Sequence, residues 1–294
     1  MNPRMVKAWV TISALALGMA CGGSFNEGDV REKGANQGSR KYQNEMGVAY
    51  QDPPQKNVQP NYPLALVWYE AAATPTNHVI QSGDTLVEIL SRYRVRDERF
   101  KEANPNLDLG KFSGGKLEPG TELVIPGLPD AMYNAGALLE QRYADLKRTE
   151  KEALAEAAIW YLKGAKAEHR ESQFMYGYAL ETGRGVELNL REAGSFHELA
   201  ARRGLAEAQQ RLAMLHFNGF GELDKKDTSK AYEWASIAKK TYQQDLVSAV
   251  ESKKEGLLQA IDSCETVATS CAKSLSAGER GRVDRIIQAF QPQR

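Results

Sequence analysis

Residues 78–126 read HVIQSGDTLVEILSRYRVRDERFKEANPNLDLGKFSGGKLEPGTELVIP, and the local signals within them agree. A short β-rich run stops at the turn sequence Ser-Gly-Asp, and the apolar run Leu-Val-Ile closes the segment. Between them, Thr85 and Glu88 form the pattern of a capping box, and apolar residues follow at helical spacing. Pro105 ends a second short helix, because the residue before a proline is disfavoured in the α region. The sequence therefore predicts a βααβ module whose two strands pair.

The predicted module resembles a LysM carbohydrate-binding module along its whole length. The resemblance implies that it binds peptidoglycan or another N-acetylglucosamine-containing glycan in a shallow groove between two loops. Backbone amides and carbonyls suit such a neutral sugar, with small apolar side chains around its acetamido methyl group. The implied glycan-binding residues lie in the loop after the first strand and the loop after the second helix: Gly83, Asp84, Thr85, Leu86, Asn104, Pro105, Asn106 and Leu107.

A structural role for these loop residues is the alternative. Asp84 and Thr85 are of the types that begin helices, and Asn104 stands before a proline, where helices end. Residues 107–116 also depart from the family, since this connection is longer and richer in glycine than is usual. We therefore expect one wall of the implied groove to be either displaced or mobile.

The chain opens with two basic residues, Arg4 and Lys7, and an apolar run over residues 8–20 that is too short to span a bilayer. This pattern predicts an export signal over residues 1–20. Cys21 follows directly and resembles the lipidated cysteine of bacterial lipoproteins. That resemblance implies a lipid anchor in the outer membrane, with the chain facing the periplasm. The alternative is ordinary cleavage, which leaves a soluble periplasmic protein with a free thiol.

Residues 21–63 are polar and rich in Gly, Asn, Gln and Pro. Such a composition cannot bury a core, so we expect a lipidated N-terminus followed by a flexible tether. Residues 64–77 begin with the apolar run Leu-Ala-Leu-Val-Trp-Tyr. We expect this short segment to pack on the module or to lead into it.

The second half of the chain carries an internal repeat. The pattern AAIWY at residues 157–161 returns as AGSFH at residues 193–197 and as AYEWA at residues 231–235. A period of this length predicts stacked helical hairpins. The pattern resembles the Sel-one-like repeat, a relative of the tetratricopeptide repeat, and the resemblance implies a scaffold for protein partners.

The predicted fold class is therefore an α+β LysM module (βααβ), residues 78–127, joined to an all-α solenoid of helical hairpin repeats. We expect the repeats over residues 154–240, with an N-terminal capping helix at 130–153 and C-terminal capping helices at 241–294. Cys264 and Cys271 lie within residues 241–294, between two of the expected C-terminal helices. An exported chain and a bend between them favour a disulfide, whereas a continuous helix holds two free thiols about 10 Å apart.

Nothing in the sequence indicates catalysis or a cofactor. The four histidines, His78, His169, His197 and His216, lack metal-ligand spacing. Glu171 precedes a serine as in lytic transglycosylases, but it lies inside the repeat period without their glycine-rich continuation. The 38 basic and 38 acidic side chains leave no net field, which argues against a nucleic-acid partner.

These observations favour a non-enzymatic, lipid-anchored envelope protein that binds peptidoglycan and holds envelope protein partners on its helical repeats. The first alternative is a periplasmic scaffold lipoprotein of an exopolysaccharide export or envelope secretion machine, which would bind the exported polymer. The second alternative is a cell-wall hydrolase, or an accessory subunit of one.

Overall fold

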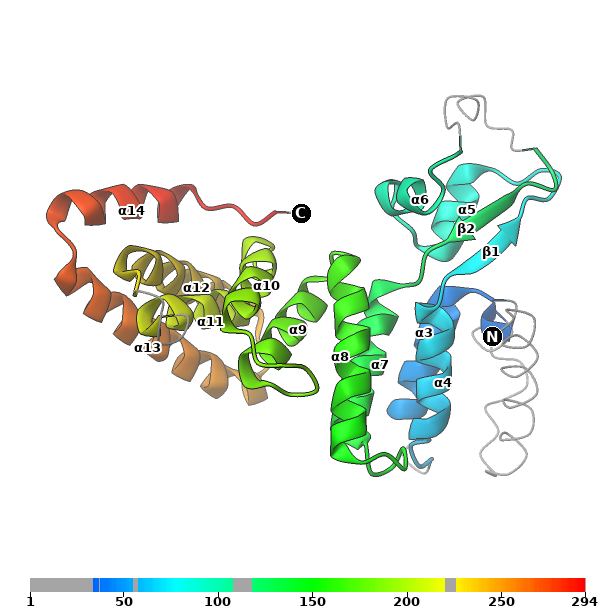
Figure 1. Cartoon of the computed structure of the whole chain (residues 1–294), viewed down its shortest axis with the longest axis horizontal. Coiled ribbons are helices and arrows are strands. Elements are labelled where there is room, and N and C mark those ends of the chain that lie inside the picture. Colours follow the sequence, from blue (N-terminus) through cyan, green and yellow to red (C-terminus); the bar gives the residue numbers. More distant parts are fainter. Residues whose placement is uncertain (1–33, 37, 55–57, 108–117, 220–225, 294) are drawn as a thin grey trace. The chain divides into compact units, whose positions relative to one another are not determined.

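The computed structural model describes residues 34–36, 38–54, 58–107, 118–219 and 226–293 (Figure 1). The chain forms two compact units, residues 1–163 and residues 164–294. The expected export signal, the expected lipidation at Cys21 and residues 108–117 of the glycine-rich connection lie outside the described residues.

The first unit contains a small antiparallel sheet and helices on either side of it in sequence. Its elements are α3 (Arg40–Gln51), α4 (Tyr62–Ala73), β1 (Thr76–Val79), α5 (Leu86–Tyr93), α6 (Asp97–Ala103), β2 (Glu122–Ile125), α7 (Pro129–Arg142) and α8 (Glu150–Lys166). The second unit is all helical. Its elements are α9 (Arg170–Thr182), α10 (Leu190–Arg202), α11 (Ala206–Asn218), α12 (Thr228–Ser248), α13 (Glu251–Ser274) and α14 (Ala277–Ala289).

The βααβ module is confirmed. β1 and β2 pair antiparallel, with His78 opposite Leu123 and Thr76 opposite Ile125. The module has its own hydrophobic core, formed by Ile80, Ile89, Val95, Phe100, Leu123 and Ile125. Of the expected capping box, the structure shows one arm: the Thr85 side chain accepts a hydrogen bond from the amide of Glu88 at 3.3 Å. The alternation of buried and exposed residues in β2 leaves one face of the sheet for this core.

The flexible tether expected over residues 21–63 is wrong for its second half. Residues 40–51 form α3, which packs against α4. Although the sequence of α3 is mostly polar, one face of this helix carries buried small and apolar residues, including Met46 and Ala49. This face packs against α4, where Met46 shares a hydrophobic cluster with Leu64 and Trp68. The apolar segment does lead into the module, as expected, but it packs on α3 and α7.

Three helical hairpins share one packing device: a glycine in the first helix makes room for a ring from the second. A Cβ atom on each glycine would lie between 2.5 and 2.9 Å from the nearest ring atom, which is closer than van der Waals contact. The three pairs are Gly47 with Tyr69, Gly136 with Tyr161, and Gly177 with His197. Only a residue without a side chain fits at these crossings.

The residue four positions after each glycine holds the same ring by a hydrogen bond. Residues four apart lie on one helix face, so this acceptor lies one turn along from the glycine. Tyr69 and Tyr161 donate through Oη, and His197 bonds through Nε2; the acceptors are Gln51 at 2.8 Å, Glu140 at 3.0 Å and Glu181 at 3.1 Å. The pair α7–α8 is therefore a hairpin of the same kind. The single N-terminal capping helix expected at residues 130–153 is wrong, because this region contributes to two helices and because α4 packs against α7, so α7 is not the first helix of the series.

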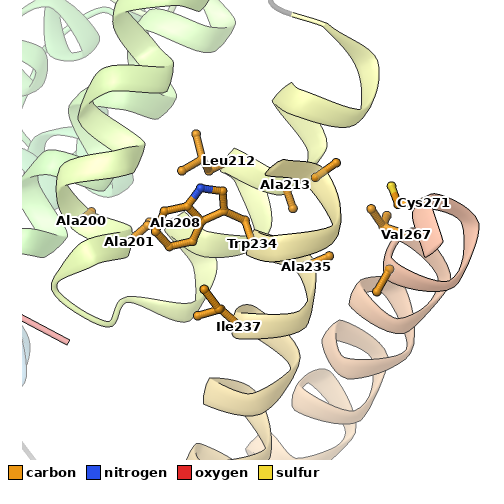
Figure 2. Packing of buried hydrophobic residues seen from close by; sticks show 12 residues of the cluster. Ala200, Ala201, Ala208, Leu212, Ala213, Trp234, Ala235, Ile237, Val267 and Cys271 are labelled. Carbon is orange, nitrogen blue, oxygen red and sulfur yellow. The ribbon is translucent and has the colours of Figure 1, made fainter. Parts of the chain in front are cut away.

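The hairpin α11–α12 replaces this device by apolar packing. Small residues line the contact, and Trp234 inserts among Ala200, Ala201 and Leu212 (Figure 2). Ala157, Ala193 and Ala231, which open the repeated pattern, are all buried, as close helix crossing requires. Helices α13 and α14 follow α12 as the expected C-terminal helices.

Replacing Gly177 by Ala should destabilise the helical unit. The new methyl group would overlap the His197 ring, and the overpacking cost of about 1–3 kcal/mol exceeds the gain in helix propensity of up to about 1 kcal/mol. Gly256→Ala is the matched control, because its helical site in α13 is open and the substitution should raise the melting temperature slightly. Equal melting temperatures for the two variants would contradict the packing argument.

The chain leaves the helices after α4 to form the module, and it returns to them before α7 at a neighbouring position. The amide of Leu128, just before α7, donates to the carbonyl of Ala72, near the end of α4, at 2.9 Å. Gly127 lies directly against the Ala73 carbonyl, where no side chain fits. The module is thus inserted between two helices, α4 and α7, that pack on each other.

Arg40 fastens this junction. Its side chain is fully buried and donates to the carbonyl of Ala72 at 2.9 Å and to the carbonyl of Ile125, at the end of β2, at 3.0 Å. Burial lowers the pKa of Arg40 to about 10, so the guanidinium stays charged at neutral pH. One side chain from α3 therefore joins the last turn of α4 to the last strand of the module.

Replacing Arg40 by Met should lower the free energy of unfolding of the first unit by about 2–3 kcal/mol, because buried carbonyls lose their donors. Hydrogen exchange should accelerate most at the end of α4 and in β2. Lys41→Met, at the neighbouring exposed position, is the control and should change stability by less than about 0.5 kcal/mol. Unchanged exchange in β2 of the Arg40 variant would show that the junction holds without it.

The possible disulfide between Cys264 and Cys271 is not formed. Both thiols are free and buried, and they lie in the continuous helix α13, without the bend that a bridge requires. Burial raises the pKa of the Cys264 thiol to about 11, which keeps it protonated and unreactive.

Candidate functional site

The first predicted loop turns at Gly83. This glycine has a φ of 95°, in the region that other residues rarely adopt, and the space around it is open. Asp84 and Thr85 follow, and Thr85 begins α5. The loop is therefore shaped by backbone conformation, with an exposed glycine at its tip.

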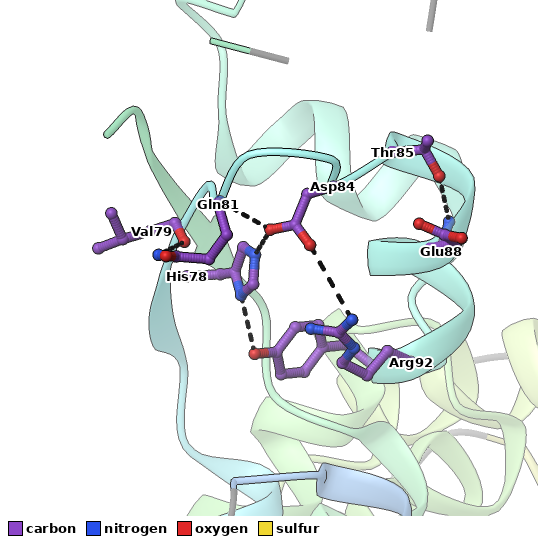
Figure 3. Close-up of polar contacts among 8 residues, drawn as sticks. His78, Val79, Gln81, Asp84, Thr85, Glu88 and Arg92 are labelled. Atoms are coloured by element: carbon purple, nitrogen blue, oxygen red, sulfur yellow. Dashed lines mark hydrogen bonds and ion pairs between the residues drawn. The ribbon is translucent and has the colours of Figure 1, made fainter. Parts of the chain in front are cut away.

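The Asp84 carboxylate is used inside the module. Its Oδ2 atom accepts from the amide of Gln81 at 2.9 Å and from Nε2 of His78 at 2.9 Å (Figure 3). Arg92 lies at 4.0 Å from the other oxygen. The Gln81 amide, followed by the His78 ring, lowers the pKa of Asp84 below its usual range. The aspartate therefore ties the loop to β1 and offers little to a ligand.

His78 continues this network into α5. Its Nδ1 atom lies 3.1 Å from Oη of Tyr93, whose pKa is raised mainly by burial. The rings of His78 and Tyr93 meet edge to face, with centroids 5.6 Å apart. Sequence reasoning missed this contact because the two residues belong to different elements, and no local pattern links positions 78 and 93.

The second predicted loop is held by Asn104. Its amide nitrogen donates to the carbonyls of Phe100 and Val124, each at 2.8 Å, and its oxygen accepts from the amide of Val124 at 2.8 Å. Both side-chain donors are thus satisfied within the module, and Asn104 is also the C-cap of α6, which ends there as the structural alternative expected. The amide of Leu107 closes the turn by donating to the backbone carbonyl of Asn104 at 3.0 Å.

The remaining predicted residues divide by exposure. Pro105 and Asn106 are exposed, whereas Leu86 and Leu107 are half-buried. Leu86 belongs to the first loop and Leu107 to the second, and both pack against the same module core. Both loops are therefore anchored on one core, and they present exposed, mostly uncharged groups.

Asn104→Ala and Asn106→Ala should separate folding from recognition. The Asn104 variant loses three hydrogen bonds and should destabilise the module by about 2–3 kcal/mol. The Asn106 variant should leave the free energy of unfolding within about 0.5 kcal/mol of the parent and weaken retention on an N-acetylglucosamine polymer. Chemical unfolding and chitin-bead binding are the two measurements. Full retention by the Asn106 variant would remove this side chain from the site.

Glu171, whose sequence context resembles that of a catalytic acid, forms local ion pairs at the start of α9. Glu171 pairs with Arg170 at 2.8 Å and lies 3.4 Å from His169. Within the described ranges, no group of three or more His, Cys, Asp or Glu side chains is placed to hold a metal ion. Among the same residues, none of the helices combines the length and the apolar character needed to cross a bilayer.

Comparison with family models identifies the modules of the chain. The LysM domain matches residues 78–126, and the Sel1 repeat matches residues 41–74, 170–205 and 206–240. The chain therefore contains a LysM domain and Sel1 repeats, which confirms both predicted resemblances. The match at residues 41–74 covers α3 and α4, which the sequence analysis assigned to the tether and the apolar segment.

One similar solved structure supports the helical fold. A protective antigen present in uropathogenic Escherichia coli strains, which displays an SLR fold, is 18% identical, with a TM-score of 0.54 over 98% of this chain. This chain spans 45% of that structure. A Sel1 repeat protein from Oxalobacter formigenes is 16% identical, with a TM-score of 0.47 over 90% of this chain and 85% of its own. No curated protein shows significant similarity.

LysM domains bind glycans and Sel1 repeats hold protein partners, so the two families together fit a binding and scaffold role. Both are typically binding or scaffold modules, which is consistent with a protein that is not an enzyme.

Proposed function

We propose that this protein is a non-enzymatic, lipid-anchored protein of the cell envelope that binds peptidoglycan through its LysM domain and holds envelope proteins on its Sel1 repeats. The observation that carries the glycan part is the pair of loops built on one core, with Gly83, Pro105 and Asn106 exposed. Neutral backbone groups at such loops suit an uncharged sugar.

The anchor belongs to the same proposal. Cys21 follows an apolar run that is typical of export signals, and a lipidated cysteine at this place would hold the protein on the periplasmic face of the outer membrane. A membrane anchor and a weak glycan contact would act together, since attachment at one end raises the effective concentration at the other.

The insertion of the LysM domain provides a sharp test. Because the Leu128 amide already contacts the Ala72 carbonyl, residues 75–126 can be removed and the ends joined by a short glycine linker. The full chain should sediment with purified, protein-free peptidoglycan sacculi, and the deletion variant should stay in solution with its helices intact. Retention should change little between low salt and about 0.5 M salt, since no charge pairing is involved.

Several outcomes would contradict the proposal. Equal sedimentation of both proteins would place the wall contact outside the LysM domain. A steep salt dependence would indicate charge pairing. Release of soluble muropeptides from the sacculi would show an enzyme. Failure to bind sacculi, with binding to a soluble acetylated exopolysaccharide instead, would favour the export-machine alternative.

A further inference from the structure

The geometry points to His78 as a positioning residue for glycan recognition: it holds the Gly83–Asp84 loop in its binding conformation without touching the sugar. This inference rests on the proposed function and assigns a role to a side chain that belongs to neither predicted loop. It starts from one feature of the module, the hydrogen-bonded series Tyr93, His78 and Asp84.

This series spans three elements. Tyr93 lies at the end of α5, His78 lies in β1, and Asp84 lies in the loop that joins β1 to α5. The side chains of His78 and Asp84 are only 9% and 11% exposed, so their bond is shielded from water. A shielded bond between a ring and a carboxylate is stronger than an exposed one. The Gly83–Asp84 loop is therefore held in place by a side chain of β1.

The aspartate needs His78 to hold one orientation. A single carboxylate oxygen, Oδ2, accepts both the Gln81 amide and the His78 ring, and this arrangement fixes the chain on both sides of Gly83. Gly83 has a backbone conformation that few neighbouring contacts restrain, since the space around it is open. Without the ring, Asp84 keeps its contacts with Gln81 and Arg92 but loses its tie to β1, and Gly83 regains conformational freedom.

The charged groups around the series do not displace it. Arg92 lies 4.0 Å from Oδ1 of Asp84, and the positive charges of Arg92 and of Arg40, from α3, both act to lower the pKa of Tyr93. The contacts of the His78 ring with Asp84 and Tyr93 therefore coexist with these neighbouring charges.

Two substitutions at one position give the test. Gln places an amide nitrogen near the position of Nε2 and keeps a donor for Asp84, whereas Met has similar length and no donor. With the purified full chain and chitotetraose, measured by isothermal titration calorimetry, His78→Gln should bind within about threefold of the parent. His78→Met should bind at least about tenfold more weakly, a change that corresponds to 1.4 kcal/mol. Tyr93→Phe keeps the ring and should stay within about threefold.

A second variant keeps the test decisive if His78→Met does not fold. Asp84→Ala removes the oxygen that both the Gln81 amide and the His78 ring use, and should weaken binding at least as much as His78→Met. The double variant His78→Met/Asp84→Ala should bind no more weakly than Asp84→Ala alone, because both changes act through one contact. Melting temperatures of all variants report whether the module is folded.

The outcomes separate this inference from the proposed function. If the parent binds chitotetraose and folded His78→Met binds equally well, the positioning role is overturned and the glycan site stands. If Gln and Met weaken binding equally in folded proteins, the hydrogen bond is not the cause and the inference fails. If the parent itself does not bind, the proposed glycan function fails, and the positioning role fails with it.

Discussion

Two helices can approach closely only where the side chains at the crossing are small or absent, and three hairpins of this protein meet this constraint with a glycine. Gly47, Gly136 and Gly177 each meet a ring from the following helix, and an acceptor one turn later holds that ring. The arrangement fixes both the distance between the helices and their register, because the ring has one site to enter and one partner to bond.

The LysM domain is accommodated because the helical hairpins do not need a continuous chain between them. α4 packs against α7 whether the connection is a short turn or a whole domain, and the contact between Leu128 and Ala72 closes the gap. Arg40 then binds the domain to the hairpin through backbone carbonyls. A guanidinium suits this role, since it has several fixed donors and remains charged when buried.

Much of the fold could be predicted, because both modules have local signals at fixed spacing. The hairpin α3–α4 was missed, although ALVWY at residues 65–69 matches AAIWY at residues 157–161. The two are 92 residues apart, which exceeds one 36-residue period by about the length of the inserted domain, so a search for a regular period passes over the match. The roles of Asn104 and of the His78–Asp84 contact were also beyond the sequence, since both join residues whose proximity depends on the tertiary fold.

A domain joined to its neighbour through one flexible connection can rotate freely relative to that neighbour. The LysM domain instead has two chain crossings side by side, near Ala72 and Leu128, and a buried arginine between them. Such an attachment resists twisting as well as pulling, because rotation would have to break all three contacts together. A polysaccharide strand bound to this domain would therefore be held at a set angle to the hairpin α3–α4. The protein would then distinguish the orientation of the polymer as well as detect its presence.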